Sequence, residues 1–220
     1  MESIVVTGAN RGIGLELVRQ YVNRGDHVYA VCRRSNEVLD ATGADIIDNI
    51  DVTSASSVKR LADCLNDIQI DRLVNNAGVL DSNSLGQIDY AQVQRQFDVN
   101  AVAPLRVTEA LLPVLQQGSK VVIITSRMGS IADNSSGGSY GYRMSKAAVN
   151  MAAKSLSIDL AGKGVAVAVL HPGYVATDMT NHQGPVSPAE SARGLLQRMD
   201  ELDMSSTGSF RHAQGDELPW

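Results

Sequence analysis

Ser3-Ile4-Val5-Val6-Thr7-Gly8-Ala9-Asn10-Arg11-Gly12-Ile13-Gly14 is the stretch that decides the fold. Residues 3–7 form an apolar run typical of a buried β-strand. Three glycines follow with the spacing G-x-x-x-G-x-G, and residues 12–23 then carry apolar side chains at helical spacing. Glycine lets the backbone approach a phosphate closely, and the N–H groups at the start of a helix attract that phosphate. The stretch therefore predicts a dinucleotide site at Gly8, Asn10, Arg11, Gly12, Ile13 and Gly14, with a tight structural turn as the alternative.

The rest of the chain alternates between apolar runs and helical patterns. Strands are expected near residues 27–32, 45–50, 70–75, 120–125, 165–170 and 208–211. Helices are expected near residues 35–41, 53–66, 89–116, 141–161 and 188–201, with Pro104 dividing the long pattern or lying near a helix start. Continuously apolar strands between helices are typical of a parallel sheet covered on both faces. We predict an α/β chain with one domain, residues 1–220, built as a Rossmann-type, doubly wound parallel sheet of about seven strands with helices on both faces.

Composition narrows the class of protein. The 220 residues are 44% hydrophobic, enough for a sizeable core, and the net charge of −5 argues against a nucleic-acid or anionic-membrane surface. The first residues lack the features of a signal peptide, and no apolar run approaches the ~20 residues of a membrane span. Two isolated cysteines, Cys32 and Cys64, fit a reducing compartment, and the scattered histidines give no metal site. We expect a cytoplasmic protein that binds neither nucleic acid nor a membrane.

Two short stretches bear on the type of dinucleotide. NAD sites usually carry an acid after the second strand, whereas this chain has Arg33 and Arg34 there. With Arg11 in the glycine turn, these arginines suit the 2′-phosphate of NADPH or NADP+, and a solvated arginine face is the alternative. Asp51-Val52 follow the third strand, where the aspartate either accepts a hydrogen bond from the adenine amino group or caps the helix that begins near residue 53.

A second group of residues has the chemistry of a proton donor. Tyr142 and Lys146 lie four apart in a helical stretch, so they share one face, and a nearby ammonium lowers the pKa of a phenol. On its own, such a pair is more often a tyrosine packed over a lysine stem. Ser126 ends a predicted strand at the edge where ligands bind, so its hydroxyl can orient a carbonyl oxygen, with a turn serine as the alternative. Asn100 lies in mid-helix, where asparagine is unfavourable and needs a reason.

In their order along the chain, these motifs resemble those of the short-chain dehydrogenase/reductase family. Besides the glycine turn they comprise Asn75-Asn76-Ala77-Gly78, Asn100, Ser126, Tyr142-x-x-Ser145-Lys146 and Pro172-Gly173-Tyr174-Val175-x-Thr177. The resemblance implies that Tyr142 is the acid–base, that Ser126 orients the substrate, and that Lys146 holds the nicotinamide ribose while lowering the pKa of the tyrosine. It further implies that Asn100 supports a water linking Lys146 to solvent. The implied cofactor set adds Asn76, Ala77, Gly78, Pro172, Gly173, Val175 and Thr177.

The chain departs from the family pattern in two segments beside the expected site. The interval between Ser126 and Tyr142 is about three residues longer than usual, and the segment after Thr177 is short where a helical lid is common. A lid excludes water and fixes specificity, so its reduction predicts an open pocket and loose selectivity. We expect Met128, Ile131, Tyr174 and Met179 to border this substrate pocket.

These features together predict an NADPH-dependent reductase of aldehydes or ketones, which takes hydride from nicotinamide and a proton from Tyr142. The alternative is a cofactor-binding regulatory or signalling protein with vestigial catalysis, whereas Arg33 and Arg34 oppose an NAD-dependent dehydrogenase. Residues 208–210 and 218–220, with the short segment, resemble the subgroup of sniffer carbonyl reductases and C-factor proteins. Surplus apolar residues in the helices near 101–115 and 141–161 suggest a homodimer or homotetramer, with deep burial in a monomer as the alternative.

Overall fold

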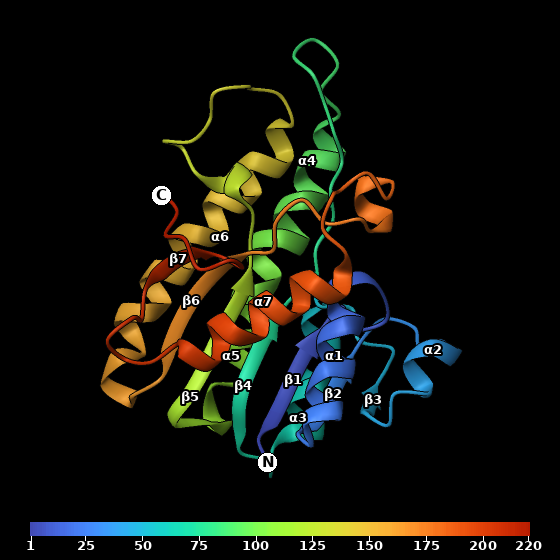
Figure 1. The fold of residues 1–220 in the computed structure, drawn as a ribbon, viewed down its shortest axis with the longest axis vertical. Helices are drawn as coiled ribbons and strands as arrows, with labels where there is room; N and C mark the ends of the chain where they lie inside the picture. The colour runs from blue at the N-terminus through green and yellow to red at the C-terminus, as the bar shows by residue number, and fades with distance from the viewer.

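The strands of the protein form one seven-stranded sheet in the order β3-β2-β1-β4-β5-β6-β7, as the ribbon in Figure 1 shows. The structure, a computed structural model, describes residues 1–220 without a gap. Every neighbouring pair of strands runs parallel, so the predicted fold class is confirmed. The strands are β1 (Ser3–Thr7), β2 (His27–Val31), β3 (Asp45–Ile47), β4 (Ile70–Asn75), β5 (Leu115–Ile124), β6 (Ala166–His171) and β7 (Ser209–His212).

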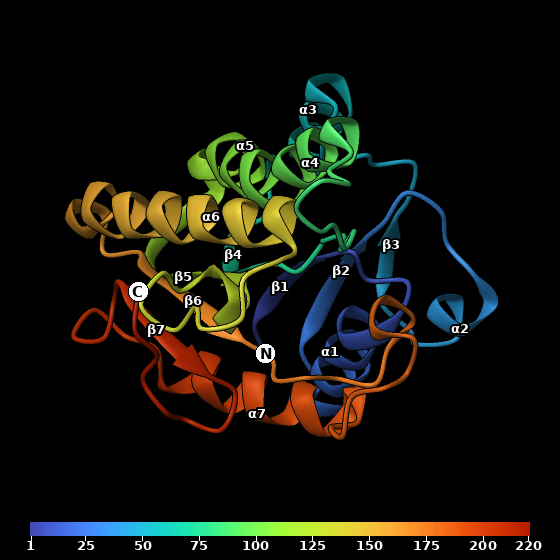
Figure 2. The same ribbon diagram turned by 90° about the horizontal axis from the view of Figure 1, so that it is seen from above.

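Helices cover both faces of the sheet. They are α1 (Gly12–Arg24), α2 (Glu37–Asp40), α3 (Ala55–Leu65), α4 (Tyr90–Phe97), α5 (Ala103–Ala110), α6 (Tyr140–Asp159) and α7 (Pro188–Glu201). Figure 2 shows α3, α4, α5 and α6 on one face and α1 and α7 on the other. Short 3₁₀ turns lie at Leu112–Val114, Arg127–Gly129, Ala161–Lys163 and Asp178–Thr180.

The strands are apolar throughout because each of their faces meets a separate core. Along β1, Val5 lies in the core beneath α3, α5 and α6, whereas Ile4 and Val6 lie in the core beneath α1 and α7. Successive side chains of a strand point to opposite faces, so a strand buried on both sides needs an unbroken apolar run. The same alternation fixes the face of the sheet toward which each residue just after a strand points, so the sheet also positions the residues of a site at its edge.

The long helical pattern predicted for residues 89–116 is interrupted. It forms α4, a π-helical segment at Asp98–Val102, and α5, and the chain is already in β5 by Leu115. Pro104 lies in the first turn of α5. Proline has no N–H to donate to the carbonyl four residues earlier, so the α-helical ladder cannot run through residue 100. The prediction that Pro104 divides the pattern or lies near a helix start is confirmed, whereas the pattern ends earlier than the predicted residue 116.

Two strand boundaries also differ from the prediction. Strand β3 ends at Ile47 rather than near residue 50, and β5 begins at Leu115 rather than Lys120. A register shift opposite Ile70 and Arg72 accompanies Gly118, whose φ is +90°. Two steps along β4, from Ile70 to Arg72, face five steps along β5, from Leu115 to Lys120, so the irregularity inserts three extra residues without ending the strand. Glycine accepts the left-handed backbone there. The polar stretch Gln116-Gln117-Gly118 therefore reads as a loop in the sequence but belongs to the strand.

The chain reverses its direction of winding between β1 and β4. From β1 it builds outward through β2 and β3, then crosses back to place β4 on the other side of β1. Connections on the two sides of such a switch point leave in opposite directions and open a crevice at the carboxyl ends of the strands, where ligands bind. The glycine turn after β1 borders this crevice, as do Asn76, Ala77 and Gly78 after β4.

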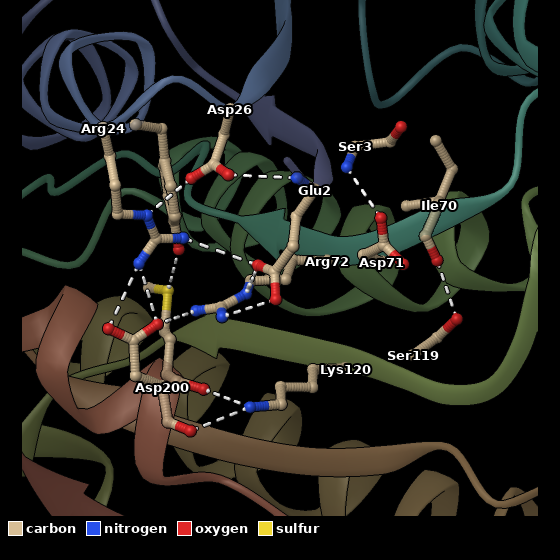
Figure 3. A network of polar contacts seen from close by, with 12 residues as sticks. Glu2, Ser3, Arg24, Asp26, Ile70, Asp71, Arg72, Ser119, Lys120 and Asp200 are labelled. Atoms are coloured by element: carbon tan, nitrogen blue, oxygen red, sulfur yellow. Dashed lines mark hydrogen bonds and ion pairs between the residues drawn. The ribbon is translucent and has the colours of Figure 1, made fainter.

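An ionic network lies near the start of β1, and the close-up in Figure 3 shows its residues. The guanidinium of Arg72, on β4, donates to Glu2 Oε1 at 3.0 Å and to Asp200 Oδ1 at 2.6 Å. Its side chain is only 5% exposed, whereas those of Glu2 and Asp200 are 38% and 45% exposed. Burial by itself lowers the pKa of Arg72, but the two carboxylates reverse this and hold the pKa above its ordinary value. Arg24 joins the network by donating to Asp200 at 2.9 Å.

Candidate active site

A cavity of about 510 Å³ lies at the carboxyl ends of the strands, over the switch point. Its lining brings together most of the residues singled out by the sequence: Gly8, Asn10, Arg11, Gly12, Ile13, Gly14, Arg33, Asp51, Val52, Asn76, Ala77, Gly78, Tyr142, Lys146, Pro172, Thr177 and Met179. Other predicted residues lie outside this lining, namely Arg34, Asn100, Ser126, Met128, Ile131, Gly173, Tyr174 and Val175. The strand ends thus collect residues from across the sequence at one place.

The glycine turn is shaped by contacts that leave no room for side chains. A Cβ at Gly14 would lie 2.3 Å from the carbonyl oxygen of Gly8 and 2.5 Å from Asn76 Nδ2, and Gly8 itself has a φ of +67°. Arg11, just before α1, makes no side-chain hydrogen bond that caps the helix, and the first turn contains no acid. The free N–H groups of that turn therefore border the cavity, an arrangement that favours a bound anion.

Asn76 and Thr7 join the glycine turn to β4. Asn76 Nδ2 donates to the carbonyl oxygens of Thr7 at 3.0 Å and Gly8 at 3.2 Å, and the Thr7 hydroxyl accepts the N–H groups of Asn76 and Ala77. The turn is consequently fixed by a segment almost 70 residues further along the chain. This geometry requires an amide donor at residue 76, which serves the carbonyl oxygens of Thr7 and Gly8. It also requires a hydroxyl at residue 7, because the N–H groups of Asn76 and Ala77 would otherwise lose their acceptor.

The structure separates the two arginines that follow β2. Arg33 is exposed and lines the cavity, whereas Arg34 is exposed outside it and contributes its carbonyl oxygen, which accepts from Asn10 Nδ2 at 2.9 Å. Arg11 also lines the cavity and lies 3.7 Å from a carboxylate oxygen of Asp178. Of the three arginines expected at the cofactor, Arg11 and Arg33 therefore border the cavity and Arg34 does not.

Asp51 takes part in the turn before α3. Its Oδ1 accepts the N–H of Thr53 at 2.9 Å and the Thr53 hydroxyl at 2.7 Å, and these bonds hold the pKa of the carboxyl below its ordinary value. The N-cap of α3 is Ser54, whose hydroxyl accepts from Ser57 N. Asp51 therefore forms the turn before α3 and does not cap the helix itself. It also lines the cavity, and its contact with the adenine amino group stays a prediction.

Tyr142 and Lys146 lie one turn apart near the start of α6, both buried against the carboxyl end of β5. Lys146 Nζ lies 5.8 Å from the centre of the Tyr142 ring and donates to the carbonyl oxygen of Ile124 at 2.9 Å. Ser126 follows β5, and its hydroxyl accepts the N–H of Met128 at 3.1 Å, so it also forms the cap of the next 3₁₀ turn. The phenol, the ammonium and the hydroxyl thus converge from one helix and one strand end.

The electrostatics of this trio differ from the expectation of a lowered phenol pKa. Burial raises the pKa of Tyr142 to about 12, and the Ser126 side chain only partly opposes this. Burial also lowers the pKa of Lys146 to about 8. The ammonium is directed at a backbone carbonyl rather than at the phenol oxygen, and burial disfavours charge on both groups. In the protein alone the tyrosine is therefore neutral at pH 7 and retains its proton.

Asn100 has the reason that its mid-helix position requires. It lies in the π-helical segment, where its amide donates to the carbonyl oxygen of Val79 and accepts the Val79 N–H, both at 2.9 Å. Its Nδ2 also donates to the Ser145 hydroxyl at 3.0 Å. A Cβ at Gly78 would lie 3.3 Å from Asn100 Oδ1 and 3.9 Å from Lys146 Nζ. This glycine therefore lies between the two side chains and close to both.

Two further residues support the buried trio: Ser145, which the sequence motif contains without a role of its own, and Gly129, which the sequence analysis did not single out. The Ser145 hydroxyl donates to the carbonyl oxygen of Tyr142 at 2.8 Å and so links α6 to Asn100. Gly129 packs against Lys146 so tightly that a Cβ there would lie 2.7 Å from the Lys146 carbonyl carbon. A glycine three residues after a candidate catalytic serine was the available signal, but close packing against a helix cannot be read from one sequence.

The residues expected to border a substrate pocket are dispersed. Met179 lines the cavity from the 3₁₀ turn at Asp178–Thr180, whereas Ile131 is 81% exposed and Tyr174 is 52% exposed, both outside the lining. Met128 is half-buried and also outside it. The turn that carries Met179 is held locally, since the side chains of Thr177 and Thr180 each bond to the backbone N–H of the other residue. The short segment therefore borders the cavity with a 3₁₀ turn and its neighbours, Thr177, Asp178, Met179 and His182, rather than with a longer helix.

None of the helices is both long enough and apolar enough to span a bilayer.

Comparison with known proteins gives relatives over the whole length of the chain. The 1-hydroxy-2-glutathionyl-2-methyl-3-butene dehydrogenase of Rhodococcus sp. (strain AD45) is 40% identical over 226 aligned positions, which cover 100% of both chains. The C-signal of Myxococcus xanthus is 49% identical over 154 residues, which span 69% of this chain and 93% of that protein.

Solved structures agree with these relatives. The carbonyl reductase Sniffer of D. melanogaster superimposes with a TM-score of 0.92 at 30% identity and full coverage of both chains. An NADPH-bound carbonyl reductase from chicken fatty liver gives a TM-score of 0.91 at 29% identity, over 100% of this chain and 99% of that one. These matches confirm the predicted likeness to the sniffer and C-factor subgroup. A family model described as short chain dehydrogenase matches residues 2–186, and the chain therefore belongs to the short-chain dehydrogenase family of oxidoreductases.

Proposed function

We propose that the protein is an NADPH-dependent reductase of aldehydes or ketones in which Tyr142 donates the proton. One observation carries this proposal: a buried, neutral phenol and a buried lysine lie at one end of a cavity whose other end has a glycine turn and two arginines. A dinucleotide of the right length would connect these two ends. The similar Sniffer protein is named a carbonyl reductase, which supports the same reaction here.

The residues present fit NADPH. At Gly8 and Gly14 the backbone approaches other backbone so closely that only glycine is accommodated, and the adjoining start of α1 directs N–H groups at the position of a pyrophosphate. Arg33 lines the cavity where a ribose acid would stand in an NAD site. A guanidinium there binds the 2′-phosphate in a fork of hydrogen bonds. The NADPH-bound state of the chicken carbonyl reductase supports the same choice of cofactor.

The side chains divide the remaining work among them. When bound, NADPH supplies the hydride for the carbonyl carbon. The Tyr142 phenol, which holds its proton at neutral pH, donates it to the carbonyl oxygen. The Ser126 hydroxyl places that oxygen by a second hydrogen bond, and the Lys146 ammonium stabilises the phenolate that remains. Burial of all three groups excludes water, which strengthens each of these interactions.

The rate of carbonyl reduction is expected to fall above about pH 8, where Lys146 loses its charge. The phenol, with a pKa of about 12, stays protonated throughout this range and does not set the limit. A neutral amine cannot stabilise a forming phenolate, so kcat/KM should decline about tenfold per pH unit once the ammonium titrates. In Lys146→Arg the guanidinium stays charged, and the decline should move to higher pH. A profile that is flat to pH 10 in the unmodified protein would contradict this role for Lys146.

The direct test of the proposed function is a screen of NADPH oxidation over aldehydes, diketones, quinones and ketoacyl thioesters. We expect turnover of several of these with at least tenfold preference for NADPH over NADH, equivalent to ~1.4 kcal/mol. In Arg33→Ser the preference should shrink while the NADH rate is retained, and Arg34→Ser is the matched control because Arg34 lies outside the cavity. Tight NADPH binding with no reduction in the whole panel would favour the regulatory or signalling alternative, for which the C-signal relative is the observation.

A second candidate function is oxidation of a hydroxylated substrate by the same side chains working in reverse. It is favoured by the 40% identity to a dehydrogenase named for a glutathionyl alcohol. In that direction Tyr142 must accept a proton, so its raised pKa favours reduction in the protein alone. An assay of the protein with glutathionyl alcohols and NADP+ or NAD+ would distinguish the two directions. If the protein is a reductase, we expect at most slow oxidation of these alcohols.

The apolar surface of α6 supports the proposed homo-oligomer. Met144, Met151 and Ile158 recur every seventh residue on α6 and are 49%, 68% and 66% exposed. They are not buried within the monomer, which was the alternative explanation of the surplus apolar residues. We therefore propose that a second copy of the chain covers this face.

A further inference from the structure

The first turn of α6, which carries Tyr142, is not capped by its own sequence. Its N-cap residue, Ser139, has a φ of +45° and makes no capping hydrogen bond with its side chain. Asn83 supplies the partners instead: its carbonyl oxygen accepts the Ser139 N–H at 2.9 Å, and its Oδ1 accepts the Gly141 N–H at 3.4 Å. The helix start is thus held by a residue 58 positions earlier in the chain.

Gln96 holds the same turn from the side of α4. It is 0% exposed, and its Oε1 accepts the N–H of Asp81 at 3.0 Å. Its Nε2 lies 2.6 Å from where a Cβ on Gly141 would stand. The absence of a side chain at Gly141 therefore admits the Gln96 amide directly against the residue that precedes Tyr142.

These contacts belong to a set of hydrogen bonds that surrounds Tyr142. Asn100 bonds both backbone groups of Val79, where the loop begins that continues to Asp81 and Asn83. On the other side, Asn100 donates to the Ser145 hydroxyl, which donates to the carbonyl oxygen of Tyr142. The loop 79–83 and the start of α6 are consequently fixed to each other on both sides of the phenol.

We propose that Gln96 and Asn83 are positioning residues for the reaction, because they fix the turn from which the Tyr142 phenol reaches the substrate oxygen. The proposal rests on the proposed function and adds to it two residues that touch neither cofactor nor substrate. Displacement of a catalytic group by ~1 Å costs about 10²-fold in rate, so the rigidity of the turn that carries Tyr142 affects the rate of the reaction.

The two amides are not explained by stability alone. Asn83 Nδ2 and Gln96 Nε2 are both buried without a hydrogen-bond partner. An unsatisfied buried donor costs about 1–3 kcal/mol, and an apolar side chain of similar shape would avoid this cost. Their acceptor oxygens, by contrast, are both used, one on the helix start and one on the loop that leads to it. The two amides therefore serve to fix the position of the helix start and of the loop that leads to it.

The experiment compares four variants. Gln96→Met keeps the length of the side chain but removes its acceptor, and Asn83→Leu removes the cap. Asn83→Asp keeps an oxygen for the Gly141 N–H, and its charge is favourable at a helix start, so it is the conservative variant. Gln94→Met, on the exposed face of α4, is the matched control. Each is assayed for kcat, for the NADPH dissociation constant, and by ¹⁹F NMR after labelling with 3-fluorotyrosine, with the Tyr142 resonance assigned from Tyr142→Phe.

We expect Gln96→Met and Asn83→Leu to lose about 10- to 100-fold in kcat while NADPH binds within twofold of the unmodified protein. Their Tyr142 resonance should shift or broaden, whereas Asn83→Asp and Gln94→Met should keep both rate and resonance. An unmoved resonance in Gln96→Met and Asn83→Leu would overturn the proposal, as would equal losses in Asn83→Asp. Should Gln96→Met fail to fold, the two Asn83 variants decide. If the unmodified protein reduces no carbonyl, the proposed function fails, but the resonance still reports whether these residues hold Tyr142.

Discussion

Tyr142→Phe is expected to reduce kcat for carbonyl reduction by about 10²- to 10⁴-fold, the contribution of a positioned proton donor. The ring is buried beside Lys146 and Ser126, so phenylalanine fills the same space and only the hydroxyl is lost. NADPH binding should change little, because the glycine turn and Arg33 at the far end of the cavity are untouched. Steady-state kinetics on the best substrate of the panel, with NADPH affinity from fluorescence titration, measures both quantities.

The matched control for this change is Tyr140→Phe. Tyr140 begins the same helix and lies outside the cavity, so its hydroxyl should be dispensable for turnover. Near-unmodified turnover in Tyr142→Phe would show that the proton comes from another group or from water, and the proposed mechanism would then be wrong. Equal losses in both variants would indicate disturbance of α6 rather than loss of a donor.

The double variant Glu2→Gln/Asp200→Asn is expected to lose about 3 kcal/mol of unfolding free energy, at the lower end of the cost of stranding a buried charge. Arg72 is buried, so removing both carboxylates leaves its guanidinium without a counter-charge. The amides still accept hydrogen bonds, which limits the loss. Arg72→Met should cost less, because Glu2 and Asp200 are partly exposed and regain water when their partner is removed.

Urea denaturation at pH 7 measures these differences. Asp63→Asn is the control, since its ion pair with Lys59 lies on the exposed face of α3 and should contribute less than ~1 kcal/mol. NADPH affinity should be unaffected in all of these variants, because none of Glu2, Arg24, Arg72 and Asp200 lines the cavity. If Arg72→Met destabilised the protein more than the double variant, burial of the guanidinium would not be the main factor.

Local signals in the sequence were sufficient for much of the fold. The helix predicted for residues 188–201 has those bounds in α7, because Ser187 accepts from Glu190 N and Pro188 occupies the first turn. The glycine turn was predictable for a similar reason: Gly14 is required by contacts with a neighbour six residues away. Where a capping residue or a close approach lies within a few residues along the chain, sequence pattern and structure agree.

What could not be predicted depends on distant partners. Arg33 and Arg34 are adjacent and chemically alike, and only the path of the backbone decides that Arg33 faces the cavity. The raised pKa of Tyr142 follows from burial and from the direction of the Lys146 ammonium, neither of which the spacing of the two residues contains. Ile131 and Tyr174 were assigned to a pocket by proximity in sequence, yet their loops place them at the surface.

The order in which the chain acquires its structure follows from the pairing of β1 with β4. The glycine turn spans Gly8 to Gly14, yet the amide that fixes it belongs to Asn76, which lies far along the chain. Parallel pairing across such a separation forms slowly, because loop closure must precede any gain from the new contacts. The glycine turn therefore acquires its final shape late: a nascent chain that ends before β4 contains all of its glycines but not the Asn76 amide that holds them in place.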